Sequence, residues 1–200
     1  QGWVAAARAA MHAEAEAIEE AAIRLEGSLS RAAELMLGHA GKVVVTGIGK
    51  SGHVGQKIAA TLCSTGTPAV FLHPAEAVHG DLGVYRPGDP TVFISKSGAT
   101  PELLRLVPAL RQLHSPLIGI IGNGQSPLAE AVDVLLDASV EHEADPNGLA
   151  PTASAIVAMA LGDALAVALM HARNFTPEDF SRFHPGGQLG RNLRLKVGEA

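Results

Sequence analysis

Three hydroxyl side chains surround a glycine at residues 95–100, where an apolar run ends and a helix is expected to begin. The segment reads SKSGAT and continues as PELL. Hydroxyl groups, a residue without a Cβ atom and a helix N-terminus together offer hydrogen-bond donors and a positive dipole end to an anion. Alternatively, Thr100 only caps a helix that begins at Pro101, but capping uses one hydroxyl and leaves Ser95 and Ser97 unused. The segment therefore predicts a loop that binds phosphate, which we call the phosphate loop.

A second glycine-rich segment, GIGKSG at Gly47–Gly52, contains a lysine. It has the G-x-G-x-x-G spacing of dinucleotide-binding folds, but no Asp or Glu stands about twenty residues later to hold a ribose. Position 44 is a valine, so the segment also fails the Walker A spacing. With both nucleotide-binding motifs excluded, the feature of this segment that could bind a ligand is Lys50, which lies between an expected strand and an expected helix. Either Lys50 faces the same anion as the phosphate loop, or it is an ordinary solvated lysine.

The elements that must position these groups alternate between strands and helices. Short β-rich runs separated by helical stretches are typical of right-handed βαβ units, and hence of a parallel sheet with helices on both faces. Ligands of such sheets bind beyond the carboxyl ends of the strands, where both glycine-rich segments lie. Ser126-Pro127 and Pro151 are expected to begin two further helices. The expected strands are Val43–Thr46, Ala69–Leu72, Thr91–Ser95, Leu117–Ile121 and Val132–Leu136.

Two helices are expected before the first strand. Apolar residues recur there at spacings of three and four, as in a helix that packs along a partner. These residues are Met11, Ala15, Ile18, Ala22, Leu25 and Leu29. The pattern slightly favours a contact between subunits over an amphipathic helix on its own domain. We predict one α/β domain over residues 1–200, with N-terminal helices to about 40, a sheet core over about 41–150 and C-terminal helices over about 151–200.

Composition excludes several classes of function. With 47% hydrophobic residues among 200, the chain can bury a full core. Its formal net charge of -5 provides no basic stripe, so nucleic acid is not an expected partner. Cys63 is the only cysteine, which excludes an intrachain disulfide and fits a reducing cytoplasm. The apolar segment 153–170 carries Asp163 near its centre, at a cost of about 2.5 to 3.5 kcal/mol in a membrane, so we expect a helix buried in the core or between subunits, and no membrane partner.

Longer motifs accompany the two glycine-rich segments. They are STGTP (64–68), HPAEAVHGDLG (73–83), EADPNGLAPTAS (143–154), LGDALA (161–166) and HPGGQLGR (184–191). Through these motifs the chain resembles the arabinose 5-phosphate isomerases, which are sugar isomerase (SIS) domain proteins, over nearly its whole length. HPAEAxHGDLG and HPGGxLGR are specific to this isomerase group, whereas the phosphate loop alone marks the wider SIS superfamily.

The resemblance implies a fold, an assembly and a reaction. The implied fold is a five-stranded flavodoxin-like parallel sheet, and the implied assembly is a homotetramer with active sites between subunits. The implied reaction interconverts D-ribulose 5-phosphate and D-arabinose 5-phosphate, in the cytoplasm, for Kdo and lipopolysaccharide biosynthesis. No cofactor is required for it.

Aldose-ketose isomerisation moves a proton between C2 and C1 through an enediol, after a furanose ring has opened. Carboxylate, imidazole and ammonium groups suit these tasks. The resemblance carries four functional residues onto this chain: Lys50, Glu102, Glu143 and His184. The chemistry makes Glu143 the enediol base, His184 the ring-opening acid or base, Lys50 the partner of the oxyanion or phosphate, and Glu102 a supporting carboxylate. Without the resemblance, Glu143 would belong to a solvated acidic turn, Glu102 would only favour a helix dipole, and His184 would be a loop histidine.

The substrate contacts also follow from the resemblance. Those to the sugar are Gly66, Thr67, His73 and His79, and those to the phosphate are Ser95, Ser97 and Thr100. His73 and His79, with Asp81 nearby, could also bind zinc through imidazole nitrogens. Enediol chemistry does not need a metal, so zinc at His73 is expected to be incidental or inhibitory.

Two features depart from the family pattern. Lys96 stands between the serines of the phosphate loop, where many members have a neutral residue, and this could shift affinity or substrate preference. Members commonly continue into a pair of CBS domains, and none is expected in this chain. The competing function is a non-catalytic SIS module that binds a sugar phosphate or a Kdo nucleotide and regulates a partner. A dehydrogenase that uses Gly47–Gly52 is a more distant third.

Overall fold

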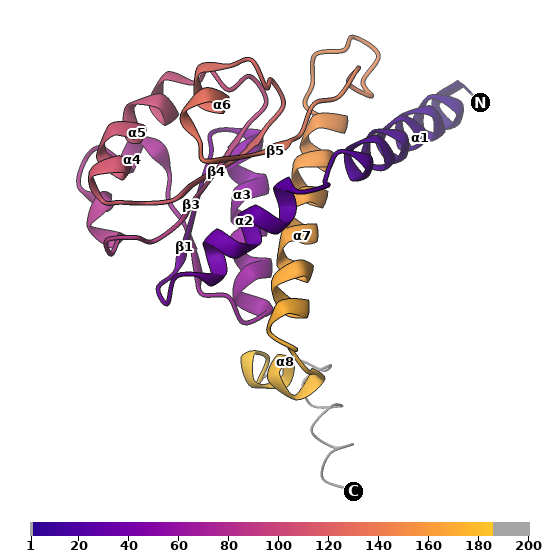
Figure 1. Cartoon of the computed structure of the whole chain (residues 1–200). Helices are drawn as coiled ribbons and strands as arrows, with labels where there is room; N and C mark the ends of the chain where they lie inside the picture. Colours follow the sequence, from indigo (N-terminus) through magenta and orange to yellow (C-terminus); the bar gives the residue numbers. More distant parts are fainter. Residues whose placement is uncertain (1, 186–200) are drawn as a thin grey trace, which may run out of the picture.

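The structure is a computed structural model that describes residues 2–185. Within these residues, five parallel strands form one sheet in the order β2-β1-β3-β4-β5 (Figure 1). The strands are β1 (Val43–Thr46), β2 (Ala69–Phe71), β3 (Thr91–Ser95), β4 (Leu117–Ile121) and β5 (Val134–Asp137). The expected five-stranded parallel sheet is therefore confirmed.

Helices cover both faces of the sheet, as a parallel sheet requires. Alternate strand residues point to opposite faces, so Val45 and Ile94 pack with α1, α2, α3 and α7, whereas Val44 and Phe93 pack with α4, α5 and α6. The helices are α1 (Gly2–Ile23), α2 (Ser28–Leu37), α3 (Lys50–Ser64), α4 (Pro74–Ala77), α5 (Pro101–Gln112), α6 (Pro127–Ala131), α7 (Ala153–Ala172) and α8 (Pro177–Phe183), with a 3-10 turn at Asp81–Val84.

The N-terminal apolar repeat does not belong to one helix. α1 ends at Ile23, and Gly27 turns the chain with φ 79° before α2 begins. The first turns of α1 extend away from the rest of the molecule, and Trp3 is 91% exposed there (Figure 1). Further along α1, Ala17 and Ala21 are buried against the domain. The two expected helices are present, and the contact between subunits stays a prediction.

The apolar helix near the C-terminus is α7. By length and composition it could cross a membrane, and it is the one such helix in the described part of the chain. Half of its most apolar window is buried, and it packs against α1, α2 and α3. Its residues Leu161, Leu165 and Leu169 belong to the larger of the two hydrophobic clusters. One side of α7 is therefore buried in the core as expected, whereas Val167 is 61% exposed, and burial of that other side between subunits stays a prediction.

Candidate functional site

A pocket lies at the carboxyl edge of the sheet, between β1 and β3. The chain leaves β1 toward β2 on one side and leaves β3 toward β4 on the other, which makes this the switch point where doubly wound sheets bind ligands. The pocket encloses about 370 Å³, including space open to solvent. Its polar lining residues are Lys50, Ser51, Ser95, Lys96 and Ser154. Both glycine-rich segments thus meet at one pocket, as expected.

The phosphate loop folds around its own serines. The backbone N–H of Gly98 donates to Ser95 Oγ at 2.9 Å, and that of Ala99 donates to Ser97 Oγ at 3.2 Å. Each serine oxygen therefore accepts a backbone hydrogen bond and keeps its own O–H to donate. Thr100 is the N-cap of α5, but its side chain makes no capping hydrogen bond and lies 3.4 Å from Ser95 Oγ instead. Thr100 and Pro101 therefore hold the N-cap and first helical positions that the alternative gave them, but the Thr100 hydroxyl is not used for capping, and phosphate binding stays a prediction.

Replacing Gly98 by alanine is expected to distort the phosphate loop. Gly98 has φ 63°, and a Cβ there would lie 1.8 Å from Ser126 Oγ, which caps α6. Gly98→Ala should lower the free energy of unfolding by about 1–3 kcal/mol and weaken the binding of inorganic phosphate. Denaturant titration and calorimetric titration with phosphate measure the two effects.

The matched control for this change is Gly124→Ala. A Cβ at Gly124 would meet only Leu135, at an ordinary 3.5 Å. This variant should unfold and bind phosphate like wild type. Equal phosphate affinity of Gly98→Ala and Gly124→Ala would show that the loop geometry does not matter for the anion.

Glu143 lies beside the pocket and is surrounded by donors. Its Oε1 accepts from Lys96 Nζ at 2.5 Å and from Ser154 Oγ at 2.5 Å. Its Oε2 accepts the backbone N–H groups of Thr152 at 2.9 Å and of Ser154 at 3.1 Å. These two amides belong to the N-terminus of α7, so the carboxylate also faces the positive end of the helix dipole.

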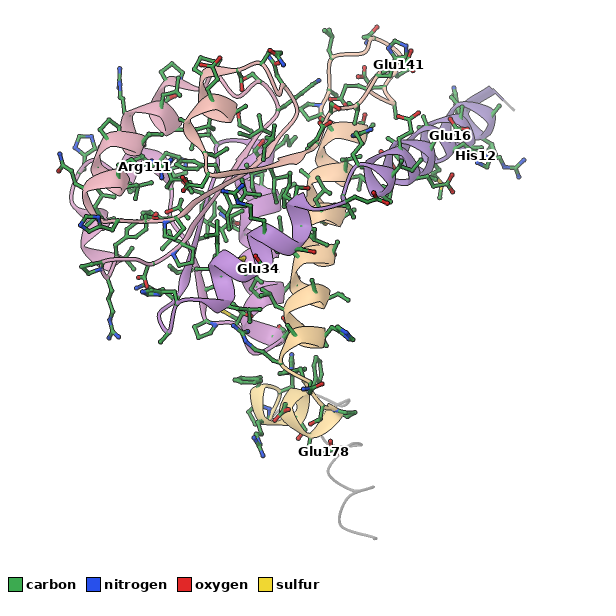
Figure 2. All side chains as sticks on the ribbon, in the orientation of Figure 1. His12, Glu16, Glu34, Arg111, Glu141 and Glu178 are labelled. Carbon is green, nitrogen blue, oxygen red and sulfur yellow. The ribbon has the colours of Figure 1, made fainter. Side chains whose placement is uncertain are left out.

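These contacts decide the charge of Glu143. Burial alone would raise its pKa, but hydrogen bonds from Lys96, Ser154 and Thr152 outweigh burial and lower the pKa to about 2. The side chain is 2% exposed, so the alternative of a solvated acidic turn is wrong for Glu143. Glu141, two residues earlier, fits that alternative, with its side chain 80% exposed on the loop before α7 (Figure 2). A carboxylate with a pKa of about 2 is a weak base, which weighs against Glu143 as the enediol base.

Lys50 and Glu102 begin the helices that follow β1 and β3. Lys50 is the first residue of α3, is exposed and lines the pocket. Glu102 is in the first turn of α5, just after the phosphate loop, and is half-buried. Among residues 2–185, no hydrogen bond or ion pair engages the Glu102 carboxylate, so its lone pairs remain free for a substrate proton.

His184, Gly66 and Thr67 lie at the opposite end of the molecule from the pocket. The N-terminus of α7 lines the pocket, and α8 with His184 follows its C-terminus, so 20 helical residues, about 30 Å, separate the two. Figure 2 shows Glu141 and Glu178 at these two ends. His184 Nδ1 is 2.8 Å from the carbonyl oxygen of Phe180, and its ring stacks on that phenyl group. One protomer does not bring His184 to the pocket.

Gly66 and Thr67 adjoin the same end as His184. They follow α3, which runs from the pocket toward the amino edge of the sheet. A Cβ at Gly66 would lie 2.7 Å from the ring of Phe175 and 3.6 Å from that of Phe183, and Thr67 Oγ1 is bonded by Arg173. The sequence-predicted site is thus divided into two groups of residues. The pocket half contains Lys50, Glu102, Glu143 and the phosphate loop. The far half contains Gly66, Thr67 and His184.

His73 and His79 lie near the carboxyl edge of β2. His73 caps α4 by accepting the backbone N–H of Ala75 at 3.3 Å, and both histidines are exposed. In residues 2–185, no three His, Cys, Asp or Glu side chains gather as a metal site, so Asp81 does not complete one with these histidines. Their contact with the sugar, and zinc at His73, stay predictions.

Sequence reasoning missed the groups that hold Glu143. Ser154 and Thr152 stand in the motif EADPNGLAPTAS, yet neither was assigned a role. Thr152 and Ser154 stand nine and eleven residues after Glu143, across a loop, and this spacing gives no periodic signal. Only Pro151 indicated that a helix N-terminus was near, and that helix begins at Ala153 with Thr152 as its N-cap.

Comparison with known proteins agrees with this geometry. A model of the SIS domain matches residues 36–168. The chain is 54% identical over 184 residues to the arabinose 5-phosphate isomerase KdsD of Pseudomonas aeruginosa, and 51% identical over 186 residues to KdsD of Escherichia coli K12. These matches cover 92% and 93% of this chain but 56% and 57% of the two relatives. The chain thus spans about half the length of the curated relatives that it matches.

Two solved structures share the fold over almost their whole length. The structure of E. coli CFT073 c3406 in complex with A5P has a TM-score of 0.87 and 39% identity, and covers 92% of this chain and 98% of its own. A putative sugar-phosphate isomerase from Listeria monocytogenes has the same TM-score and identity, with 93% and 98% covered. This chain belongs to the SIS domain family.

Proposed function

We propose that this chain is an aldose-ketose isomerase that interconverts D-arabinose 5-phosphate and D-ribulose 5-phosphate. The observation that carries the proposal is the pocket at the β1–β3 switch point, where Lys50 and the phosphate loop face the same space. An anion is favoured there by the hydroxyl of Ser95, which lines the pocket, by that of Ser97 in the same loop, and by the N-terminus of α5. The identity of about half of all residues to arabinose 5-phosphate isomerases supports the choice of sugar. A role in Kdo and lipopolysaccharide synthesis in the cytoplasm belongs to the same proposal.

The roles of the pocket residues follow from their surroundings. Glu102 acts as the enediol base, because its carboxylate has no hydrogen-bond or ion-pair partner among residues 2–185 and lies half-buried beside the phosphate loop. It removes the proton from C2 of the open aldose and returns it to C1, while the proton on O2 moves to O1 as the enediol collapses. Lys50 stabilises the negative charge that develops on the oxygen. Ser95, Ser97 and Thr100 hold the phosphate, and the histidines 73 and 79 contact the sugar.

The far half takes part through a second subunit. His184 opens the furanose by giving a proton to the ring oxygen as its bond to C1 breaks, while the C1 hydroxyl loses its proton to solvent and becomes the carbonyl, which requires His184 to approach the ring oxygen. Since about 30 Å of helix separates it from the pocket of its own protomer, a second protomer supplies it. A homotetramer with active sites between subunits satisfies this requirement, and the exposed apolar residues of α1, Trp3 and Met11, offer a surface for assembly.

Turnover of arabinose 5-phosphate in a coupled assay tests the proposal. Wild type is expected to produce ribulose 5-phosphate, and Glu102→Gln should lower kcat by about 10² to 10⁴ because a positioned base is lost. The matched control is Glu130→Gln, which removes an exposed carboxylate from the first turn of another helix and should keep full activity. Binding of the sugar phosphate by wild type without turnover would instead support a regulatory SIS module.

A further inference from the structure

Lys96 is a charged residue of the pocket to which the proposed mechanism gives no task. It follows the last residue of β3, and its side chain is 48% exposed. Its Nζ lies 2.5 Å from Glu143 Oε1, and in the part of the chain that the structure describes it has no other acceptor. An ammonium group has three N–H donors. Two of them therefore remain for a ligand in the pocket that Lys96 lines together with Lys50.

Glu143 holds this ammonium group in place. The carboxylate cannot swing toward solvent, because its other oxygen is fixed by the amides of Thr152 and Ser154. A free lysine side chain samples many rotamers, and ordering it on ligand binding costs conformational entropy. The ion pair with Glu143 orders the Lys96 side chain before a ligand binds. Ligand binding therefore loses little further conformational entropy at Lys96.

Glu143 does not cancel the charge that Lys96 presents. The negative charge of Glu143 is shared between Lys96, Ser154 and the N-terminus of α7. It is also buried behind the lysine, with 2% of its side chain exposed against 48% for Lys96. A ligand in the pocket therefore meets the ammonium group and not the carboxylate.

We infer that Lys96 is a second cation for the phosphate of the substrate, and that Glu143 is the residue that positions it. The inference rests on the proposed function, because the phosphate belongs to the same sugar. Two ammonium groups and the phosphate loop then surround one dianion, which favours phosphorylated over unphosphorylated sugars. Lys96 sets affinity and Glu143 acts through Lys96, whereas proton transfer is left to Glu102 and His184.

Calorimetric titration with inorganic phosphate tests the role of Lys96 without turnover. Lys96→Gln should raise the Kd for phosphate about tenfold, because a charge-assisted hydrogen bond in a partly exposed site is lost. Lys96→Arg keeps the charge and should stay within about threefold of wild type. With arabinose 5-phosphate, Lys96→Gln should raise KM by a similar factor and change kcat by less than about threefold.

The matched control is Lys57→Gln. Lys57 also pairs with a carboxylate, Asp163, but lies outside the pocket, so its loss removes the same charge without touching the ligand. Its phosphate Kd should equal that of wild type. An equal change in Lys57→Gln and Lys96→Gln would overturn the inference, because only general charge would then matter.

A double-mutant cycle tests whether Glu143 acts through Lys96. Glu143→Gln should change the phosphate Kd in the wild-type background and leave it unchanged when Lys96 is already Gln. An equal effect in both backgrounds would overturn the positioning role. The failure of the proposed function and the failure of this inference can be told apart. If wild type binds phosphate but does not turn over arabinose 5-phosphate, only the isomerase function is contradicted. If wild type turns over the sugar phosphate but Lys96→Gln has an unchanged phosphate Kd, only this inference is contradicted.

Discussion

Mixing two inactive variants, Glu102→Gln and His184→Ala, is expected to restore isomerase activity. Each variant alone should lose about 10² to 10⁴ in kcat, because each lacks one proton-transfer group. If the pocket half and the far half of one site come from different subunits, random exchange rebuilds intact sites. With equal amounts, each half is intact with a chance of one in two, so activity should return to about a quarter of wild type. The measurement is turnover after unfolding and refolding the two proteins together.

The control for this experiment combines two defects in the same half. Glu102 and Lys50 both begin helices at the carboxyl edge of the sheet. A mixture of Glu102→Gln and Lys50→Met therefore contains no intact pocket half and should stay inactive. No recovery with Glu102→Gln and His184→Ala, once subunit exchange is verified by native mass spectrometry, would contradict the site between subunits.

The sheet was predictable from sequence because its strands are short, apolar and bounded by turn residues. The strands Val43–Thr46, Thr91–Ser95 and Leu117–Ile121 have the expected bounds. The last strand differs: it was expected from Val132 but begins at Val134. The helix before it explains the difference, because α6 continues to Ala131 and Val132 is its C-cap, so the strand cannot begin there.

The pocket half was predictable for a similar reason. Parallel strands put their carboxyl ends at one edge, so the residues after β1 and β3 had to meet there. Ser126-Pro127 also began a helix as expected, with Ser126 accepting the N–H of Ala129 at 3.3 Å. Strand ends and helix starts depend on a few adjacent residues, so they can be predicted from the sequence alone.

Contacts between distant residues were not predictable. Lys96 and Glu143 are 47 residues apart, and the sequence around neither residue predicts that they form an ion pair. Their contact depends on how the loop after β5 returns to the N-terminus of α7, which periodicity does not encode. The distance of His184 from the pocket likewise follows from the straight course of α7. For this reason the role of base, which sequence chemistry gave to Glu143, passes to Glu102 in our proposal.

Glu143 should also make a measurable contribution to stability that depends on pH. Its pKa is lowered from 4.5 to about 2 in the folded chain, so folding favours the ionised form. A lowered folded pKa means that the stabilisation is present above pH 4.5 and is lost as the pH falls toward 2. At pH 7 the difference corresponds to about 3 kcal/mol. Glu143→Gln should lower the free energy of unfolding by roughly that amount at pH 7, and the gap to wild type should shrink between pH 5 and pH 2.

Denaturant titrations of both proteins across this pH range provide the test, and Glu141→Gln is the matched control. Glu141 lies in the same loop with its side chain 80% exposed, so its loss should change the free energy of unfolding by less than about 0.5 kcal/mol at every pH. Other buried carboxylates, such as Asp89, also lose stabilisation in acid, but they do so equally in wild type and variant and cancel in the difference. A gap that stays constant from pH 7 to pH 3 would mean that Glu143 contributes packing and neutral hydrogen bonds. A gap that closes would show that the ionised carboxylate, held between Lys96 and the N-terminus of α7, is what stabilises this side of the pocket.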